Sequence, residues 1–228
     1  MDNTSRSRPS ALPDTALEDY LKTIYQHTEW QNEPITPSVL AAKLGIAPPS
    51  VTEMVKKLVI AGLVNHVPYG PLTLTRTGAA RATGVIRRHR LIETWLVREM
   101  GYHWDEVHDE AEILEHSISD KLLDAIDKRL GCPEQDPHGD PIPAADGTVK
   151  EYQARLLMTA LPGDCGTIIR INDRNPDLLR HLAEISIGPG TPLCVKSTDK
   201  TSISVVAARS GAIQVIPASA GDAIWITA

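Results

Sequence analysis

The densest set of potential metal ligands in this sequence lies between residues 108 and 116, where histidines and carboxylates recur at helical spacing. At about 100° per residue, a helix would carry four of them within an arc of about 100°: His108, Glu112, Glu115 and His116. Carboxylates stacked on one helix face repel each other, and a bound cation would offset that cost. The segment therefore predicts a helix with a cation-binding face.

A second pair of potential ligands, His89 and Glu93, is spaced at i and i+4 in the preceding segment. The pair lies beside an apolar stripe that includes Val85 and Leu96, in a helix expected to begin near Thr77, so both side chains should be half-buried and face neighbouring helices. One such pair is more often a surface salt bridge. Nitrogen and oxygen ligands converging from two consecutive helices instead favour a metal site.

Catalytic motifs find no support in the sequence. The zinc-protease pattern HxxEH would need His at the position of Glu112, and a di-iron bundle would need Glu-x-x-His in two helices. No P-loop, dinucleotide fingerprint or nucleophile elbow is present. We therefore expect a binding protein and not an enzyme.

The first third of the chain has the pattern of a winged helix. Apolar residues from Leu17 to Ile24 recur at helical spacing, a second helix should run from Pro37 to a stop at Gly45, and Pro48 should open a third. Residues 63–66 and 72–75, on either side of the turn at 68–71, have the pattern of a β-hairpin. The alternative is a helical protein-interaction module followed by a hairpin.

The third of these helices is the expected recognition helix, which reads bases from its N-terminal turns. Small and apolar side chains there could contact thymine methyl groups, hydroxyls could donate to phosphates or base edges, and lysines could neutralise backbone charge. The predicted DNA-binding residues are Ala47, Pro49, Ser50, Thr52, Lys56 and Lys57.

The net charge of −6 conceals an uneven distribution. Residues 1–90 carry 11 basic and 7 acidic side chains, residues 91–150 carry 5 and 15, and residues 151–228 carry 7 of each. This favours a DNA-facing module joined to a cation-binding module, although charged helix surfaces alone could produce the same pattern. The first ten residues have no apolar stretch and no run approaches membrane-spanning length, so we expect a cytoplasmic protein without membrane contact.

The three cysteines, Cys132, Cys165 and Cys194, are far apart and show no CxxC pattern. An odd, sparse set of cysteines is typical of proteins in a reducing compartment. The sequence therefore predicts structural thiols.

Four segments together resemble the diphtheria toxin repressor family of iron- and manganese-dependent regulators: residues 18–25, 88–93, 107–116 and 136–143. The resemblance implies an α+β chain of three domains. These are a winged-helix DNA-binding domain at residues 1–76, a helical dimerisation and metal-binding domain with a linker at residues 77–145, and a small SH3-like β-barrel at residues 150–228.

The resemblance also implies two metal sites per subunit. One would contain His89, Glu93 and His108, completed by a carboxylate of the third domain, for which loop matching favours Asp177 over Asp173. The other would contain Asp19, Glu112, Glu115 and His116. In this interpretation a metal draws Asp19 toward the second group, which it would otherwise repel, and so orients the DNA-binding domain.

Two carboxylates favour manganese over iron as the expected metal. Iron-type members of the family have Met and Cys where this chain has Asp19 and Glu112, and hard oxygen ligands suit Mn²⁺. The predicted function is a manganese-dependent homodimeric repressor of metal-uptake genes that binds an inverted-repeat DNA operator. The alternatives are an Fe²⁺-dependent repressor and a metal-buffering protein without specific DNA binding. Lys22 replaces a Glu of short manganese members, which favours separated metal sites.

The last third of the chain is rich in β-formers. Strands are expected at residues 167–171, 193–196, 202–207, 212–216 and 223–226, and a short helix from Asp177 to Ala183, which together suggest the five-stranded barrel. Residues 133–143 are rich in Pro, Gly and Asp and have the composition of a linker, in which His138 is interpreted as a turn residue in preference to a ligand. The barrel could donate a metal ligand, contact this linker, or do both.

Overall fold

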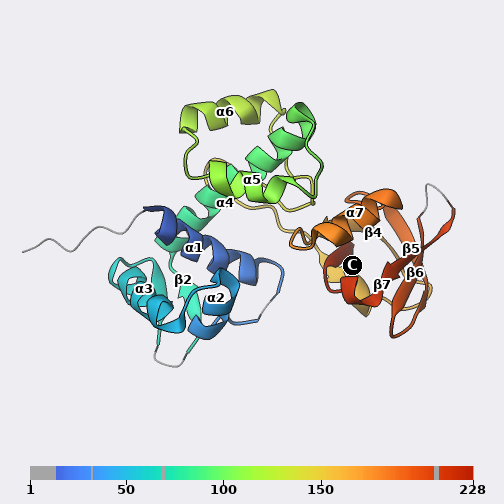
Figure 1. Cartoon of the computed structure of the whole chain (residues 1–228), viewed down its shortest axis with the longest axis horizontal. Helices are drawn as coiled ribbons and strands as arrows, with labels where there is room; N and C mark the ends of the chain where they lie inside the picture. The colour runs from blue at the N-terminus through green and yellow to red at the C-terminus, as the bar shows by residue number, and fades with distance from the viewer. Residues whose placement is uncertain (1–13, 32, 68–69, 208–210, 228) are drawn as a thin grey trace, which may run out of the picture. The chain divides into compact units, whose positions relative to one another are not determined.

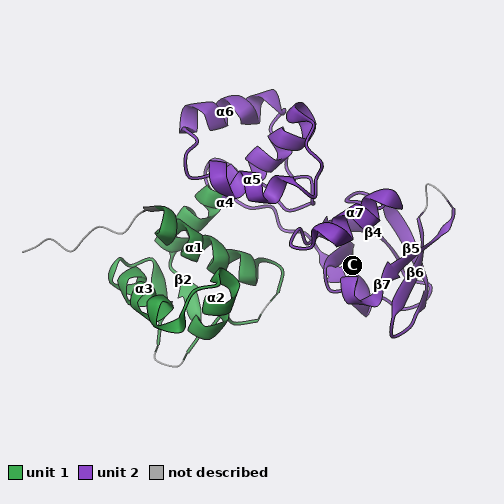
Figure 2. Ribbon diagram, viewed as in Figure 1, with its two compact units in different colours: residues 1–85 green, residues 86–228 purple. Residues whose placement is uncertain are grey.

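The computed structural model describes residues 14–31, 33–67, 70–207 and 211–227 (Figure 1). The described chain divides into two compact units, with the boundary between Val85 and Ile86 (Figure 2). The first ten residues and the Pro68-Tyr69 pair of the expected turn lie outside the described residues. None of the helices in the described ranges has the length and apolar character to cross a membrane.

The first unit has the element order of a winged helix, as the sequence predicted. Its elements are α1 (Asp14–Glu29), α2 (Pro37–Leu44), α3 (Pro48–Ile60), β1 (Val64–His66) and β2 (Leu72–Leu74). The strands are antiparallel, with Val64 opposite Leu74. Because the chain contains no Phe, the core of this unit is mainly aliphatic and is formed by side chains such as Leu21, Leu40 and Leu58.

Local signals define both ends of α2. The hydroxyl of Thr36 accepts a hydrogen bond from the backbone N–H of Val39, and Pro37 occupies the first turn, where its missing N–H costs nothing. Gly45 ends the helix at φ +64°, a conformation that penalises any residue with a Cβ. The chain can then turn sharply into α3, which begins at Pro48.

Three helices follow: α4 (Arg76–Met100), α5 (Val107–Leu114) and α6 (Asp120–Arg129). The last was not anticipated from the sequence. Its N-terminus is capped by Ser119, whose hydroxyl accepts a hydrogen bond from the N–H of Leu122. Ile92 and Leu96 of α4 pack on Val107 and Ala111 of α5 in a small apolar cluster, so the faces of α4 and α5 that carry the histidines are held near each other.

The rest of the second unit is built around a sheet. In the described ranges the sheet has six antiparallel strands in the order β3-β8-β4-β5-β6-β7, and α7 (Pro176–Glu184) follows β4 (Figure 1). The strands are β3 (Ala154–Leu156), β4 (Cys165–Ile171), β5 (Pro192–Thr198), β6 (Ser202–Ala207), β7 (Ile213–Pro217) and β8 (Ile224–Thr227), with 3-10 turns at Leu157–Thr159 and Ala218–Ala220. All five expected strands are present, and β3 is additional. The expected α+β class is confirmed.

The segment expected to be a linker is packed into the second unit. Residues 138–143 are all buried. The guanidinium of Arg90 donates to the carbonyl of Pro141 at 2.7 Å, and the N–H of Ile171 in β4 donates to the carbonyl of His138 at 2.9 Å. At Gly139 (φ +91°) an added Cβ would collide with the carbonyl oxygen of Ile169. Glycine therefore permits the close approach of this segment to β4.

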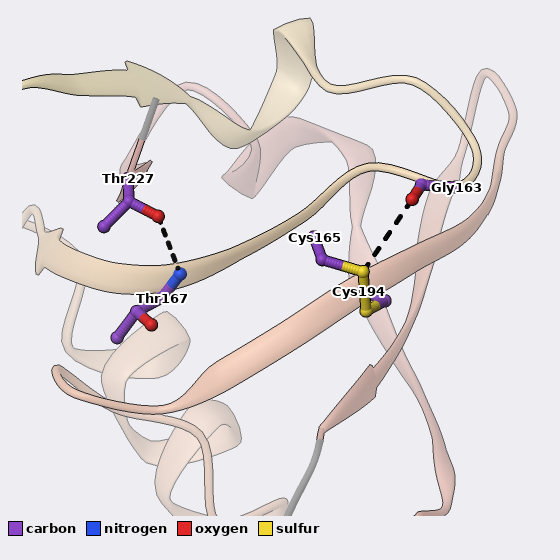
Figure 3. Close-up of a disulfide and its surroundings, with 5 residues drawn as sticks. All are labelled: Gly163, Cys165, Thr167, Cys194 and Thr227. Atoms are coloured by element: carbon purple, nitrogen blue, oxygen red, sulfur yellow. Dashed lines mark hydrogen bonds between the residues drawn. A yellow bond between two sulfur atoms is a disulfide. The ribbon is translucent and has the colours of Figure 1, made fainter.

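Cys165 and Cys194 form a disulfide between β4 and β5, where they lie directly opposite each other (Figure 3). The prediction of three thiols is thus wrong for this pair, while Cys132 is a free, exposed cysteine. The two cysteines are separated by 29 residues, and only the pairing of the strands brings them together. The bond joins the first residue of β4 to β5, and the last residues of β4 lead into the region of the candidate metal centre.

Candidate metal centre and DNA-binding surface

Helices α4 and α5 bring three of the predicted ligands together. His89 and Glu93 lie one turn apart on α4, with 3.1 Å between Nε2 of His89 and Oε1 of Glu93. His108 approaches from the first turn of α5, with its Nδ1 3.7 Å from the same oxygen. His89 and Glu93 are buried, and the side chain of His108 is half-buried. Spacing along the helices predicted this convergence, and packing of α4 on α5 produces it.

The fourth potential ligand at this centre is the carboxylate of Asp173, in the turn between β4 and α7. Its Oδ2 lies 3.0 Å from Nδ1 of His108. One donor atom from each of His89, Glu93, His108 and Asp173 falls within 4.8 Å of the others. A side chain from the last third of the chain therefore lies within this group of donor atoms.

The structure corrects which carboxylate that is. Asp177, which loop matching favoured, is not part of the group: its side chain is 90% exposed and accepts from the guanidinium of Arg180, with 2.5 Å between Oδ1 and Nη2. The reason is local, because Asn175 caps α7 and Pro176 begins it, so Asp177 falls on the exposed face of the first helical turn. Asp173 precedes this cap and comes two residues after the end of β4, whose last two residues are buried. Its place just after a buried strand was the one signal available in the sequence.

A metal ion fits this donor set. Protein nitrogen and oxygen ligands bind metals at about 2.0–2.6 Å, which places neighbouring donors on one ion about 3–4 Å apart, and the three separations above lie in that range. Nδ1 of His89 lies 2.5 Å from Oε2 of Glu115, so it carries a proton, and whenever the ring is neutral its lone pair is at Nε2. That lone pair faces an oxygen of Glu93, and a cation between them would relieve the repulsion.

In the metal-free protein, the opposite charges within this group shift the pKa values of its members. Burial alone would raise the pKa of Glu93, but His89 and His108 outweigh it and hold this pKa well below its usual range. Burial alone would lower the pKa of His108, yet hydrogen bonds to Asp173 and Glu93 raise it to about 10. The pKa of Asp173 is lowered by His108 against the effect of burial. The centre is therefore a strongly polarised cluster in which a divalent cation would compete with the proton of His108.

The other predicted group is distributed over both units. Glu112 lies on α5 with its side chain 41% exposed and its Oε1 3.6 Å from Nε2 of His108. Glu115 is fully buried at the C-terminus of α5, with Oε1 3.4 Å from Nε2 of the following His116. Asp19 belongs to α1 in the first unit, so its approach to these residues stays a prediction. Sequence analysis missed one role: Glu115 also contacts His89 of the first group.

The expected recognition helix presents the predicted DNA-binding residues. All six are exposed at or along α3, while Val51, Val55 and Leu58 on its opposite face are buried. The hydroxyl of Thr52 donates to the carbonyl of Pro48 at 3.0 Å, which leaves its oxygen as an acceptor for a base donor. Lys56 pairs with Glu53 at 2.7 Å. DNA contact by these residues stays a prediction.

Family models match most of the chain. The N-terminal DNA-binding domain of iron-dependent repressors matches residues 14–72, and the metal-binding and dimerisation domain of these repressors matches residues 75–144. A FeoA domain matches residues 155–228.

Known proteins similar to this chain include metal-dependent regulators. The chain is 31% identical to the iron-dependent repressor IdeR of Mycobacterium tuberculosis over 209 residues, which cover 86% of this chain and 89% of IdeR. It is 38% identical to the diphtheria toxin repressor of Corynebacterium diphtheriae over 137 residues, or 59% of each chain. A solved manganese-dependent transcriptional repressor in complex with manganese has a TM-score of 0.88 and 43% identity, over 93% of this chain and 99% of that one.

Proposed function

Because the chain belongs to the iron-dependent repressor family of metal-dependent DNA-binding regulators, which includes the diphtheria toxin repressor, we propose that it represses metal-uptake genes when Mn²⁺ binds to it. One observation carries the choice of metal. Both predicted groups offer nitrogen and oxygen donors only, because this chain has the carboxylates Asp19 and Glu112 where iron-type members of the family have Met and Cys. Such ligands suit Mn²⁺, whereas thiolate and thioether ligands suit softer metals.

Each ligand has a distinct role at this centre. His89 and Glu93 present donors from α4, and His108 adds one from α5. Asp173 ties the turn after β4 to these helices. Bound Mn²⁺ would supply positive charge among the carboxylates and replace the proton of His108.

The second predicted group links metal binding to DNA. Asp19 of the DNA-binding unit would complete Glu112, Glu115 and His116, giving two metal sites per subunit. Carboxylates on both sides repel each other without a metal, and an ion between them fixes the recognition helix relative to the dimer. Two recognition helices of a homodimer then enter successive major grooves of an inverted repeat. The protein would act in the cytoplasm, where the operator is.

The decisive experiment measures metal-dependent DNA retention by the wild type and by variants of two aspartates. Purified protein is incubated with sheared genomic DNA at fixed ionic strength, with Mn²⁺, with anaerobic Fe²⁺ or with chelator, and the retained DNA is sequenced. We expect inverted-repeat fragments to be enriched with Mn²⁺ only. Asp173→Asn should need at least about tenfold more Mn²⁺ for the same enrichment, since ligand and orienting groups each affect metal affinity about 10–100-fold.

Asp177→Asn is the matched control. It removes the same charge from the same region of the chain, but its carboxylate is exposed and pairs with Arg180, so its Mn²⁺ requirement should equal that of the wild type. Equal effects of the two substitutions would contradict the assignment of Asp173. Mn²⁺ binding without any enriched DNA would instead favour a metal-buffering protein.

An Fe²⁺-dependent repressor is the second candidate, supported by the 31% identity to IdeR over most of both chains. The anaerobic Fe²⁺ arm of the experiment distinguishes the two. Enrichment at a lower concentration of Fe²⁺ than of Mn²⁺ would favour iron.

A further inference from the structure

His138, interpreted from the sequence as a turn residue, lies beside the metal centre with its ring held in place. It is 1% exposed and stacks on Trp104, with 5.8 Å between ring centroids and 16° between planes. Its Nε2 is 2.7 Å from the carbonyl oxygen of Trp104. A carbonyl can only accept a hydrogen bond, so Nε2 carries a proton, and in the neutral form of the ring the lone pair is at Nδ1.

That lone pair has no hydrogen-bond partner among the described residues, although the atom is buried. Nδ1 of His138 lies 3.9 Å from Oε2 of Glu93, too far for a hydrogen bond. A buried nitrogen left unsatisfied is costly. A metal-binding histidine characteristically donates its other ring N–H to a carbonyl or carboxylate, which is the arrangement His138 has with Trp104.

Asp136 is the third member of this group. Donor atoms of Glu93, Asp136 and His138 lie within 4.8 Å of one another, and all three side chains are buried. Oδ1 of Asp136 accepts the backbone N–H groups of His138 and Asp140, each at 2.9 Å. These bonds hold the carboxylate and the imidazole of one short loop against α4.

The two oxygens of Glu93 face different groups. Oε1 faces His89 and His108, whereas Oε2 faces His138. We propose that Glu93 bridges two divalent cations, of which the second is held by Glu93, Asp136 and His138. Carboxylates bridge metal pairs about 3.5–4 Å apart in many two-metal sites. The proposal rests on the proposed function, because Glu93 is also a ligand of the first centre.

The charges around the loop support a cation. Burial and the charge of Asp140 raise the pKa of Asp136 to about 8, so two ionised carboxylates at this place are unfavourable without added positive charge. Arg90 supplies part of it, with Nε 3.7 Å from Oδ2 of Asp136 and Nη2 3.3 Å from Oδ1 of Asp140. The alternative occupant is a proton on Nδ1 of His138, which would make an imidazolium.

Counting bound metal tests the proposal. The full chain and two variants, His138→Gln and Asp136→Asn, are dialysed to equilibrium against Mn²⁺, and metal per subunit is measured. Each variant should bind about one equivalent fewer than the wild type. Electron paramagnetic resonance of the loaded wild type should show a spin-coupled Mn²⁺ pair, and each variant should show isolated ions only.

Two controls match these changes. His181→Gln removes a half-buried histidine of α7 that belongs to neither metal group, and Asp146→Asn removes an exposed aspartate; both should bind as much Mn²⁺ as the wild type. Asp136→Asn keeps the oxygen that accepts the two backbone hydrogen bonds, so it decides the question if His138→Gln disturbs the fold.

The failure of this proposal is distinct from failure of the proposed function. If Asp136→Asn binds as much Mn²⁺ as the wild type, or if the loaded wild type never shows the coupled signal, a second cation held by Glu93, Asp136 and His138 is excluded. Mn²⁺-dependent DNA retention would then be unaffected. A wild-type chain that binds no Mn²⁺ would overturn both proposals.

Discussion

Nδ1 of His89 and Oε2 of Glu115 are 2.5 Å apart, and both side chains are buried. The contact joins the two predicted metal groups, because His89 belongs to one and Glu115 to the other. The carboxylate accepts the Nδ1 proton and so directs Nε2 of His89 toward Glu93. We therefore expect metal at one group to affect the geometry available to the other.

Replacement of Glu115 by Gln should weaken Mn²⁺ binding about 10–100-fold. The amide oxygen can still accept the hydrogen bond from His89. The negative charge that makes Nε2 of the imidazole a stronger electron-pair donor to the metal is lost. Isothermal titration of Mn²⁺ measures the change, and Asp109→Asn, an exposed change of the same kind on α5, is the control. Equal dissociation constants for Glu115→Gln and wild type would show that Glu115 does not support His89.

Mn²⁺ affinity should rise with pH. In the metal-free protein the pKa of His108 is about 10, so this ring is protonated at neutral pH and the metal must displace its proton. We expect release of about one proton per bound ion and an affinity that rises about tenfold per pH unit between about pH 7 and 9. Titration calorimetry in buffers of different ionisation enthalpy measures the proton release.

The same shift acts on the stability of the metal-free protein. The pKa of His108 is higher in the folded chain than its ordinary value of 6.5, so its stabilising contribution is complete below about pH 6.5 and is lost as the pH rises toward about 10. Asp173→Asn removes the main partner that raises this pKa and should reduce both effects. A proton release of zero on Mn²⁺ binding to the wild type would contradict the predicted displacement of the His108 proton, on which both pH effects depend.

Loss of Lys57 should weaken binding to all DNA sequences alike. A lysine that neutralises one phosphate contributes about one unit to the slope of log affinity against log salt, so Lys57→Ala should lower that slope by about one. Lys56→Ala should have a smaller effect, because Lys56 already pairs with Glu53. The control is Lys121→Ala in α6, which removes an equal charge outside the first unit. Loss of selectivity at one base pair would instead indicate direct base contact.

The disulfide should stabilise the second unit. A crosslink that closes a loop of this length contributes about 3–4 kcal/mol. Cys194→Ser should therefore unfold at lower denaturant concentration than the oxidised wild type, and at a similar concentration to the wild type in reductant. Cys132→Ser should change neither result, because Cys132 is free and exposed. A wild type equally stable with and without reductant would show that the bond contributes nothing.

Sequence periodicity by itself determined the local architecture of the first unit and three of the four members of the group formed by His89, Glu93, His108 and Asp173. The order of helices and strands in the first unit follows from apolar spacing and from residues such as Pro37 and Gly45, whose backbone preferences act within a few positions. His89 and Glu93 share a helix face by their spacing alone. The resemblance to the family rests on the same short segments.

The tertiary structure decided the pairings between distant segments. Asp173 and Asp177 have the same chemistry, and only the cap at Asn175 and the packing of β4 place the first at His108 and the second in solvent. Strand register brings Cys165 to Cys194. Contacts of this kind depend on how whole elements pack, because the spacing of residues along one segment carries no information about the segment it will meet.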